Sequence, residues 1–135
     1  MLKLIIGVKG TGKTKTLINM VNTSSAESQG DVVCIEKGTK LRYDVKSKVR
    51  LINTEEYHVA DAATLYGFVA GVFASNHDVT DLYIDSALKI CQNDLVAFDA
   101  FVDETSALAE KLGVNIVITS SIPAEEASET VKKYL

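Results

Sequence analysis

The sequence predicts an α/β fold with three layers, in which helices cover both faces of a mainly parallel β-sheet. Short apolar runs bounded by turn residues recur along the chain, as strands buried on both faces require. Segments with helical spacing separate these runs, which is the order expected of parallel strands joined by crossover helices. A glycine-rich segment also joins the first run directly to the first helical segment.

The first half of the chain contains two expected core strands and one region whose strand pairing the sequence leaves undecided. Residues 2–6 form a nearly continuous apolar run that ends at a glycine, and residues 31–36 form the second run. Apolar positions at helical spacing predict a helix from Lys13 to about Thr23 between them. Residues 40–53 hold two further strand-like runs, which predict either a hairpin or an edge strand.

The second half of the chain continues the same order of helices and strands. Asp61 is a suitable N-cap for a helix whose apolar residues recur at intervals of three and four. Residues 82–85 are the third expected core strand. A long helix starts near Asn93 and ends at Gly113, a common residue after a helix C-terminus.

The last part of the sequence predicts one more strand and one more helix. Residues 114–119 are rich in valine and isoleucine and form the fourth expected core strand. Pro123 is expected to begin a final helix, since proline suits the first turn. Acidic residues follow it closely and Lys132 and Lys133 come late, an order of charges that complements the helix dipole.

Length and composition favour one globular domain over residues 1–135 and argue against several classes of partner. The formal net charge of -4 is unfavourable for a surface that neutralises nucleic acid, so the basic residues between positions 37 and 50 are interpreted as a solvated loop. No apolar stretch reaches the ~20 residues that span a bilayer, and the N-terminus does not resemble a cleavable signal. The sequence therefore predicts a cytoplasmic protein without a membrane partner.

The cysteines and histidines suggest structural roles rather than redox or metal chemistry. Cys34 and Cys91 lie in apolar stretches and form no CxxC pair, so they are expected to be core thiols. His58 and His77 have no partner at the spacing of metal ligands.

Residues 7–14 read Gly-Val-Lys-Gly-Thr-Gly-Lys-Thr and match the P-loop pattern G-x-x-x-x-G-K-S/T. Glycines let the backbone curl so that its N–H groups point at phosphates, and the following helix presents its positive end to the same anion. Lys13 is expected to reach the β- and γ-phosphates, and the Thr14 hydroxyl to ligate Mg²⁺. The alternative is a glycine turn that only connects strand to helix. The predicted nucleotide-binding residues are Gly7, Lys9, Gly10, Thr11, Gly12, Lys13, Thr14 and Lys15.

A second metal-binding residue is expected at the end of a neighbouring strand. Asp85 follows an apolar run at the carboxyl end, where ligands bind in open α/β sheets. Asp81 is the alternative, but it precedes the run. The sequence contains no N-K-x-D motif for guanine, which favours ATP over GTP as the nucleotide bound with Mg²⁺.

With these motifs the chain resembles the P-loop NTPase superfamily, in its minimal RecA-like branch, and short bacterial proteins labelled ATP-binding. Asp85-Ser86-Ala87-Leu88 is similar to the metal-binding strand end of RecA-type ATPases, and residues 116–120 to their next strand, which carries a polar γ-phosphate sensor. The resemblance implies the strand order 2–6, 114–119, 82–85, 31–36. The chain departs from usual RecA-like domains in being smaller and in showing no evident fifth strand. It also implies that Glu36 activates the attacking water, although a solvated carboxylate at a strand end is an equal alternative.

Three functions remain open from the sequence. The first is slow hydrolysis of ATP or another nucleoside triphosphate, with Lys13 and Glu36 as the catalytic residues. Only Arg42 and Arg50 could offer a guanidinium from within the chain, so an arginine is expected from a second copy or from a partner protein. The second is a binding module that responds to nucleotide without turnover. The third is a small-molecule kinase with an acceptor pocket near Tyr57, His58, Tyr66 and the segment after Asp85.

Overall fold

The computed structural model describes all 135 residues and contains one five-stranded parallel sheet in the order β1-β5-β4-β2-β3. The strands are β1 (Leu2–Ile6), β2 (Asp31–Glu36), β3 (Arg50–Asn53), β4 (Val79–Ile84) and β5 (Asn115–Ser120). The predicted fold class and the predicted order of four strands are confirmed. The fifth strand, which was not evident from the sequence, is β3, and it confirms the edge-strand alternative for residues 40–53 because it extends the sheet beside β2.

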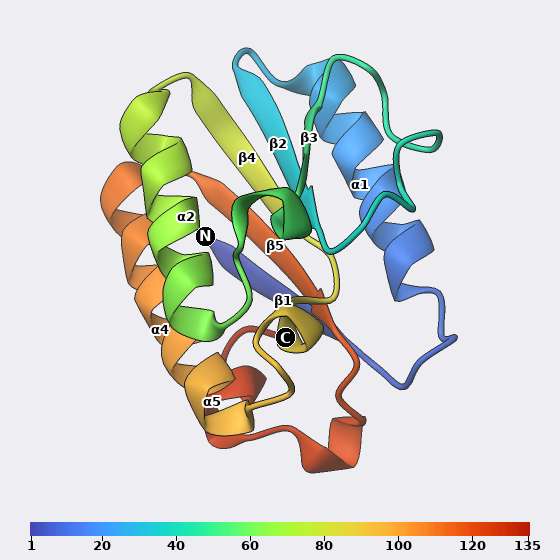
Figure 1. Cartoon of the computed structure of the whole chain (residues 1–135), viewed down its shortest axis with the longest axis vertical. Coiled ribbons are helices and arrows are strands. Elements are labelled where there is room, and N and C mark those ends of the chain that lie inside the picture. Colours follow the sequence, from blue (N-terminus) through green and yellow to red (C-terminus); the bar gives the residue numbers. More distant parts are fainter.

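Helices lie on both faces of this sheet, as Figure 1 shows. The helix α1 covers one face, and α2 and α4 pack side by side on the other. The helices are α1 (Lys13–Glu27), α2 (Ala62–Ser75), α3 (Ala87–Ile90), α4 (Leu95–Leu112) and α5 (Glu129–Lys132), with 3₁₀ turns at Thr54–Tyr57 and Ala124–Glu126. No helix here combines the length with the apolar character that a membrane crossing demands.

The strands divide the apolar core into two layers because successive side chains point to opposite faces. In β2, Val33 and Ile35 belong to a cluster of 26 buried residues that includes the inner faces of α2 and α4. Val32 and Cys34 belong to a cluster of nine that includes α1. Both cysteines are buried and unbridged, which confirms their expected place in the core.

The segment before β3 forms neither a hairpin nor a second strand. A hairpin would require antiparallel pairing, whereas β3 runs parallel to β2. The segment folds instead as a series of turns that buries Leu41, Val45 and Val49 against α1, while Tyr43 is 85% exposed. These three residues are buried at every fourth position, whereas a strand with one exposed face would bury every second position.

This loop is fastened to α1 by one side chain. The Asn22 amide donates to the Asp44 carbonyl oxygen at 2.9 Å, and its oxygen accepts the Lys46 N–H at 2.9 Å. The loop between β2 and β3 is therefore a fixed part of the α1 layer.

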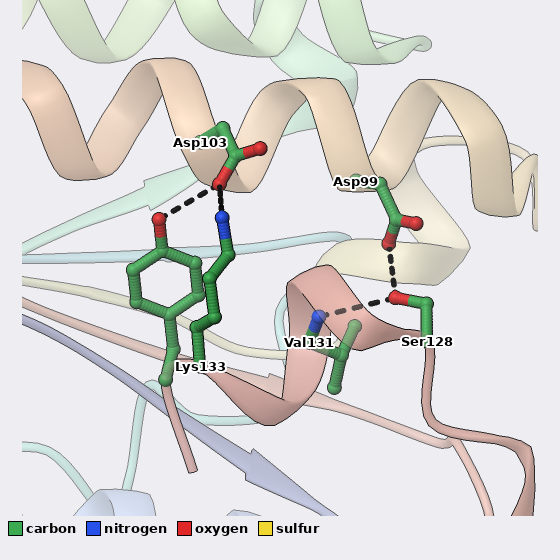
Figure 2. A network of polar contacts seen from close by, with 6 residues as sticks. Asp99, Asp103, Ser128, Val131 and Lys133 are labelled. Atoms are coloured by element: carbon green, nitrogen blue, oxygen red, sulfur yellow. Dashed lines mark hydrogen bonds and ion pairs between the residues drawn. The ribbon is translucent and has the colours of Figure 1, made fainter.

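The expected final helix from Pro123 is broken into a 3₁₀ turn and the short α5. Ser128 causes the restart, because its hydroxyl accepts the Val131 N–H at 3.1 Å and donates to Asp99 of α4 at 2.9 Å (Figure 2). Asp103 on the same helix accepts from Lys133 at 3.1 Å and from the Tyr134 hydroxyl at 2.7 Å. These bonds lower the pKa of Asp103 and fix the last segment along α4.

Two predicted helix ends are confirmed. The Asp61 carboxylate accepts the Thr64 N–H at 2.8 Å and so caps α2. Gly113 ends α4 in the left-handed conformation, with φ of 67°.

Candidate functional site

The loop between β1 and α1 has the curled backbone that its glycines predict. Gly10 and Gly12 both adopt φ of 86°, a left-handed conformation that other residues rarely take, and α1 begins at the next residue. The Val8 carbonyl oxygen accepts from the Thr11 hydroxyl at 2.7 Å and from Lys13 Nζ at 2.8 Å. The Lys13 ammonium therefore lies over the loop, at the N-terminus of the helix.

The end of β4 lies against the start of α1. The Thr14 hydroxyl is 3.2 Å from Asp85 Oδ1 and 3.3 Å from Oδ2, although the two residues are 71 positions apart. Asp85 is buried and also accepts the Thr119 hydroxyl at 2.7 Å. The alternative residue, Asp81, bonds to Thr80 and Asn115 inside the sheet, away from this contact.

Side chains from β5 hold the turn that follows Asp85. Ser86 has a left-handed φ of 56°, and its N–H donates to the Thr119 hydroxyl at 2.8 Å. The Leu88 N–H donates to the Ser120 hydroxyl at 3.3 Å. Thr119 and Ser120 are both buried and thus support the turn. The next residue, Ser121, lines the neighbouring cleft.

A cleft of about 560 Å³ opens above the Thr14–Asp85 contact. Asp85 is the only carboxylate among its lining residues. Five lysines line it, and none of them forms an ion pair: Lys9, Lys13, Lys15, Lys40 and Lys89. A cleft with this charge suits a polyanion, although the chain as a whole is acidic.

The apolar part of the cleft wall consists of two leucines. Leu41 comes from the smaller core cluster, on the α1 side of the sheet. Leu88 comes from the larger cluster, on the opposite side.

The structure brings six of the eight predicted nucleotide-binding residues to the cleft, the exceptions being Gly7 and Thr11. Gly7 has a packing role, because a Cβ there would lie 2.7 Å from Thr11 Oγ1. Neither arginine lines the cleft: Arg42 and Arg50 face hollows beside β3, and the Arg42 guanidinium lies 4.8 Å from the centre of the Tyr43 ring.

Glu36 lies at the end of β2, behind the cleft wall. It is buried, and its two carboxylate oxygens accept the N–H groups of Lys40 at 3.0 Å and Leu41 at 3.2 Å. Burial raises the pKa of Glu36 above its ordinary value, as does the charge of Asp85, while the two backbone hydrogen bonds act in the opposite direction.

This raised pKa predicts how stability should depend on pH. A carboxyl group whose pKa is higher in the folded state stabilises the fold below its ordinary pKa of 4.5, and this contribution is lost as pH rises through the folded value. Urea unfolding of the nucleotide-free protein from pH 4 to 7 should therefore show the wild type losing stability relative to Glu36→Gln, by at most about 1.4 kcal/mol per pH unit. The expectation would be contradicted if the free energy of unfolding of the wild type stayed constant or rose, relative to that of Glu36→Gln, as pH increases from 4 to 7.

Besides Ser86, which the sequence placed beside the predicted metal ligand Asp85 without a binding role, four polar residues that line the cleft were not predicted: Lys40, Lys89, Asn93 and Ser121. Each follows the carboxyl end of a central strand, Lys40 after β2, Lys89 and Asn93 after β4, and Ser121 after β5. Because these ends meet at one edge of a parallel sheet, polar residues after every predicted strand were the available signal.

A smaller hollow adjoins the cleft where the sequence predicted an acceptor pocket. It has a volume of about 330 Å³ and shares Lys89 with the cleft. His58, Glu55 and Lys37 also line it. Tyr57 and Tyr66 do not: the Tyr57 ring packs 5.6 Å from that of Phe68, and Tyr66 packs against the core.

Comparisons with known proteins find a match for the fold but none for the sequence. No family model matches the sequence, and no curated protein matches it either. Among solved structures, a KaiC-like protein of the hyperthermophilic archaeon Pyrococcus horikoshii matches with a TM-score of 0.70 at 16% sequence identity. The match covers 98% of this chain but only 66% of that chain. This likeness supports the RecA-like α/β fold, and it does not point to a particular bacterial family.

Proposed function

We propose that this protein binds a nucleoside triphosphate, with ATP preferred, together with Mg²⁺, and hydrolyses it slowly. The observation that carries the proposal is the Thr14–Asp85 contact beneath a cleft lined by five lysines without acidic partners. A hydroxyl and a carboxylate beside concentrated positive charge suit a metal ion bound to a polyphosphate.

The phosphate chain would be held by the curled loop and its lysines. The N–H groups of the loop and of the first turn of α1 supply a neutral anion site, and Lys9, Lys13 and Lys15 add charge around it. Lys13 would exchange its bond to the Val8 carbonyl for a charge-assisted bond to a phosphate oxygen.

Mg²⁺ would be held by the Thr14 hydroxyl and by the Asp85 carboxylate, directly or through water. The described residues contain no cluster of three or more acidic, histidine or cysteine ligands, so two protein groups fit an ion that takes its other ligands from phosphate and water. When bound, Mg²⁺ neutralises charge that develops on the phosphate oxygens. Thr119 holds Asp85 in place from behind.

Turnover is proposed to be slow because the cleft lacks two groups that accelerate it. No arginine lines it, and Asp85 is its only carboxylate. Glu36, which the resemblance assigned to the attacking water, does not line the cleft. The proposal therefore rests on Lys13, Thr14 and Asp85, and an arginine from a second copy or a partner protein remains part of it.

Thermal unfolding with ATP, GTP or ADP, each with and without Mg²⁺, tests binding. A ligand at ~100 times its Kd should add about 2.7 kcal/mol of stability, which corresponds to a rise in Tm of roughly 10 °C for a domain of this size. The rise should depend on Mg²⁺ and be larger for ATP than for GTP. A Tm that none of the nucleotides changes would remove the proposal.

Phosphate release under single-turnover conditions separates hydrolysis from binding alone. A slow release that disappears when the metal is chelated supports the ATPase. Tight binding with no release, even at concentrations that favour self-association, would identify the protein as a binding module that responds to nucleotide.

One observation keeps the kinase as a second candidate, namely the hollow that shares Lys89 with the cleft. An acceptor bound beside His58 would lie next to the phosphate chain. Transfer of the ³²P-labelled terminal phosphate to members of a nucleoside and metabolite library would identify this activity, and phosphate release to water alone would exclude it.

A further inference from the structure

The loop from Lys37 to Leu41 is held from both of its sides. At one side the Glu36 carboxylate accepts the N–H groups of Lys40 and Leu41. At the other, the Gly38 N–H donates to the side-chain oxygen of Asn53 in β3 at 2.8 Å, and Gly38 takes a left-handed φ of 102°. The loop conformation is therefore set by two side chains that lie outside the cleft.

This arrangement directs Lys40 to the cleft. The Leu41 side chain is 2% exposed and anchors the loop in the α1 layer, while Lys40 beside it is exposed and lines the cleft with Lys13, Thr14 and Asp85. Thr14 and Asp85 mark the metal and hence the β–γ end of a bound triphosphate. Lys40 follows β2, the strand next to that of Asp85 and further from the P-loop strand β1, which places it toward the terminal phosphate.

We propose that Glu36 is a positioning residue that holds the Lys37–Leu41 loop so that Lys40 contacts the terminal phosphate of the bound nucleotide. The inference rests on the proposed function and deepens it. In this proposal Lys40 of the same chain supplies a positive charge at the terminal phosphate, a role for which the sequence predicted an arginine from a second copy or a partner protein.

The physical case depends on preorganisation. Binding a phosphate costs a lysine conformational entropy in both its side chain and its backbone. The backbone part of this cost is small for Lys40, because the buried Glu36 carboxylate already fixes its backbone. A contact that only the third phosphate can make would strengthen ATP binding without strengthening ADP binding. Glu36 would act on this preference only through Lys40.

Calorimetric titration of Mg²⁺-ATP and Mg²⁺-ADP tests the role of Lys40. Lys40→Met keeps the apolar stem and removes the charge, so ATP affinity should fall about tenfold or more, the size of a lost charge-assisted contact. ADP affinity should change by less than about threefold, and Lys40→Arg should restore most of the preference for ATP. Lys48→Met is the matched control, because Lys48 is an exposed lysine of the same loop region that lines a different hollow. An unchanged ratio of ATP to ADP affinity in Lys40→Met would overturn the proposal.

The role of Glu36 is tested by combining substitutions. Glu36→Gln should lose the preference for ATP as Lys40→Met does, and the double variant should lose no more than the stronger single variant. If Glu36→Gln abolishes phosphate release while the ratio of affinities stays at the wild-type value, Glu36 acts on the reacting water and the positioning role is wrong.

Amide hydrogen exchange tests positioning without any nucleotide. Glutamine offers one acceptor oxygen in place of two, so in Glu36→Gln at least one of the Lys40 and Leu41 amides should exchange faster, whereas the Lys46 amide, which donates to Asn22, should keep its wild-type rate. Unchanged exchange at Lys40 and Leu41, or faster exchange at Lys46 as well, would overturn the local role of Glu36. Failure of the wild type to bind any nucleotide would instead remove the proposed function and the role of Lys40 with it, while the exchange result would still stand.

Discussion

Lys13→Ala is expected to weaken the binding of Mg²⁺-ATP by about two orders of magnitude and to abolish phosphate release. The lost contact joins an ammonium to a phosphate oxygen, and charge-assisted bonds of this kind contribute about 1.5 to 3 kcal/mol. In the nucleotide-free protein, Lys13 Nζ bonds only to the exposed Val8 carbonyl. The variant should therefore stay folded, with an unfolding midpoint close to that of the wild type.

The control for this substitution is Lys3→Ala, which removes the same charge from an exposed position on β1 outside the cleft. Affinities of both variants can be measured by titration at one salt concentration, since ionic screening alters any phosphate contact. If Lys13→Ala binds as tightly as Lys3→Ala, the glycine-rich loop is only a connection between strand and helix.

Asp85→Asn is expected to remove the effect of Mg²⁺ on binding. In the wild type, the metal should raise ATP affinity strongly, because in the proposed complex it would link the nucleotide to Asp85 and Thr14. The neutral variant loses that link but also removes the only negative charge of a lysine-lined cleft. Its affinity for metal-free ATP should therefore rise, by a few-fold, while phosphate release falls by about a hundredfold or more.

Titration with and without EDTA measures both changes, and their opposite signs separate the metal role from simple damage. Asp81→Asn is the control, since Asp81 lies on the same strand but bonds within the sheet. An Asp85→Asn variant that keeps its dependence on Mg²⁺ would show that the metal is held elsewhere. The amide oxygen can still accept the Thr119 hydroxyl, so the turn after β4 should survive.

The central part of the fold could be predicted because its signals are local and repeated. The strands β1, β2, β4 and β5 are apolar runs between turn residues, and β1 leads directly into the glycine pattern of residues 7–14. Their order followed from the resemblance to RecA-like proteins and not from periodicity. Thr14 and Asp85 were paired by the rule that ligands gather at the carboxyl ends of parallel strands.

The region before β3 could not be predicted because tertiary packing determines it. Leu41, Val45 and Val49 are buried by docking on α1, and the Asn22 side chain that holds the loop lies 22 positions before its partner Asp44. Neither feature leaves a trace in a short window of sequence. The break before α5 is similar only in part: Ser128 caps α5 through the nearby Val131 N–H, whereas its bond to Asp99 joins the turn to a helix 29 positions earlier in the chain.

At the candidate site, the lysines that lie outside the P-loop motif could not be predicted from a short window of sequence either. Lys9, Lys13 and Lys15 were predicted because they belong to one motif. Lys40 and Lys89 come from separate loops, and the sequence predicted a solvated loop around Lys40 and no role for Lys89. What distinguishes Lys40 from its neighbours is a pair of backbone hydrogen bonds to Glu36. Such a relation between two residues appears only when the fold is known.

The two leucines of the cleft wall have a consequence for how this molecule opens and closes. Leu41 and Leu88 each belong to a different apolar layer, and the two layers have no buried residue in common. A ligand seated between them would add free energy to both layers at once, so neither could open locally without releasing it. Occupancy of the cleft should therefore couple the packing on the two faces of the sheet, and protection against amide exchange should increase on both faces.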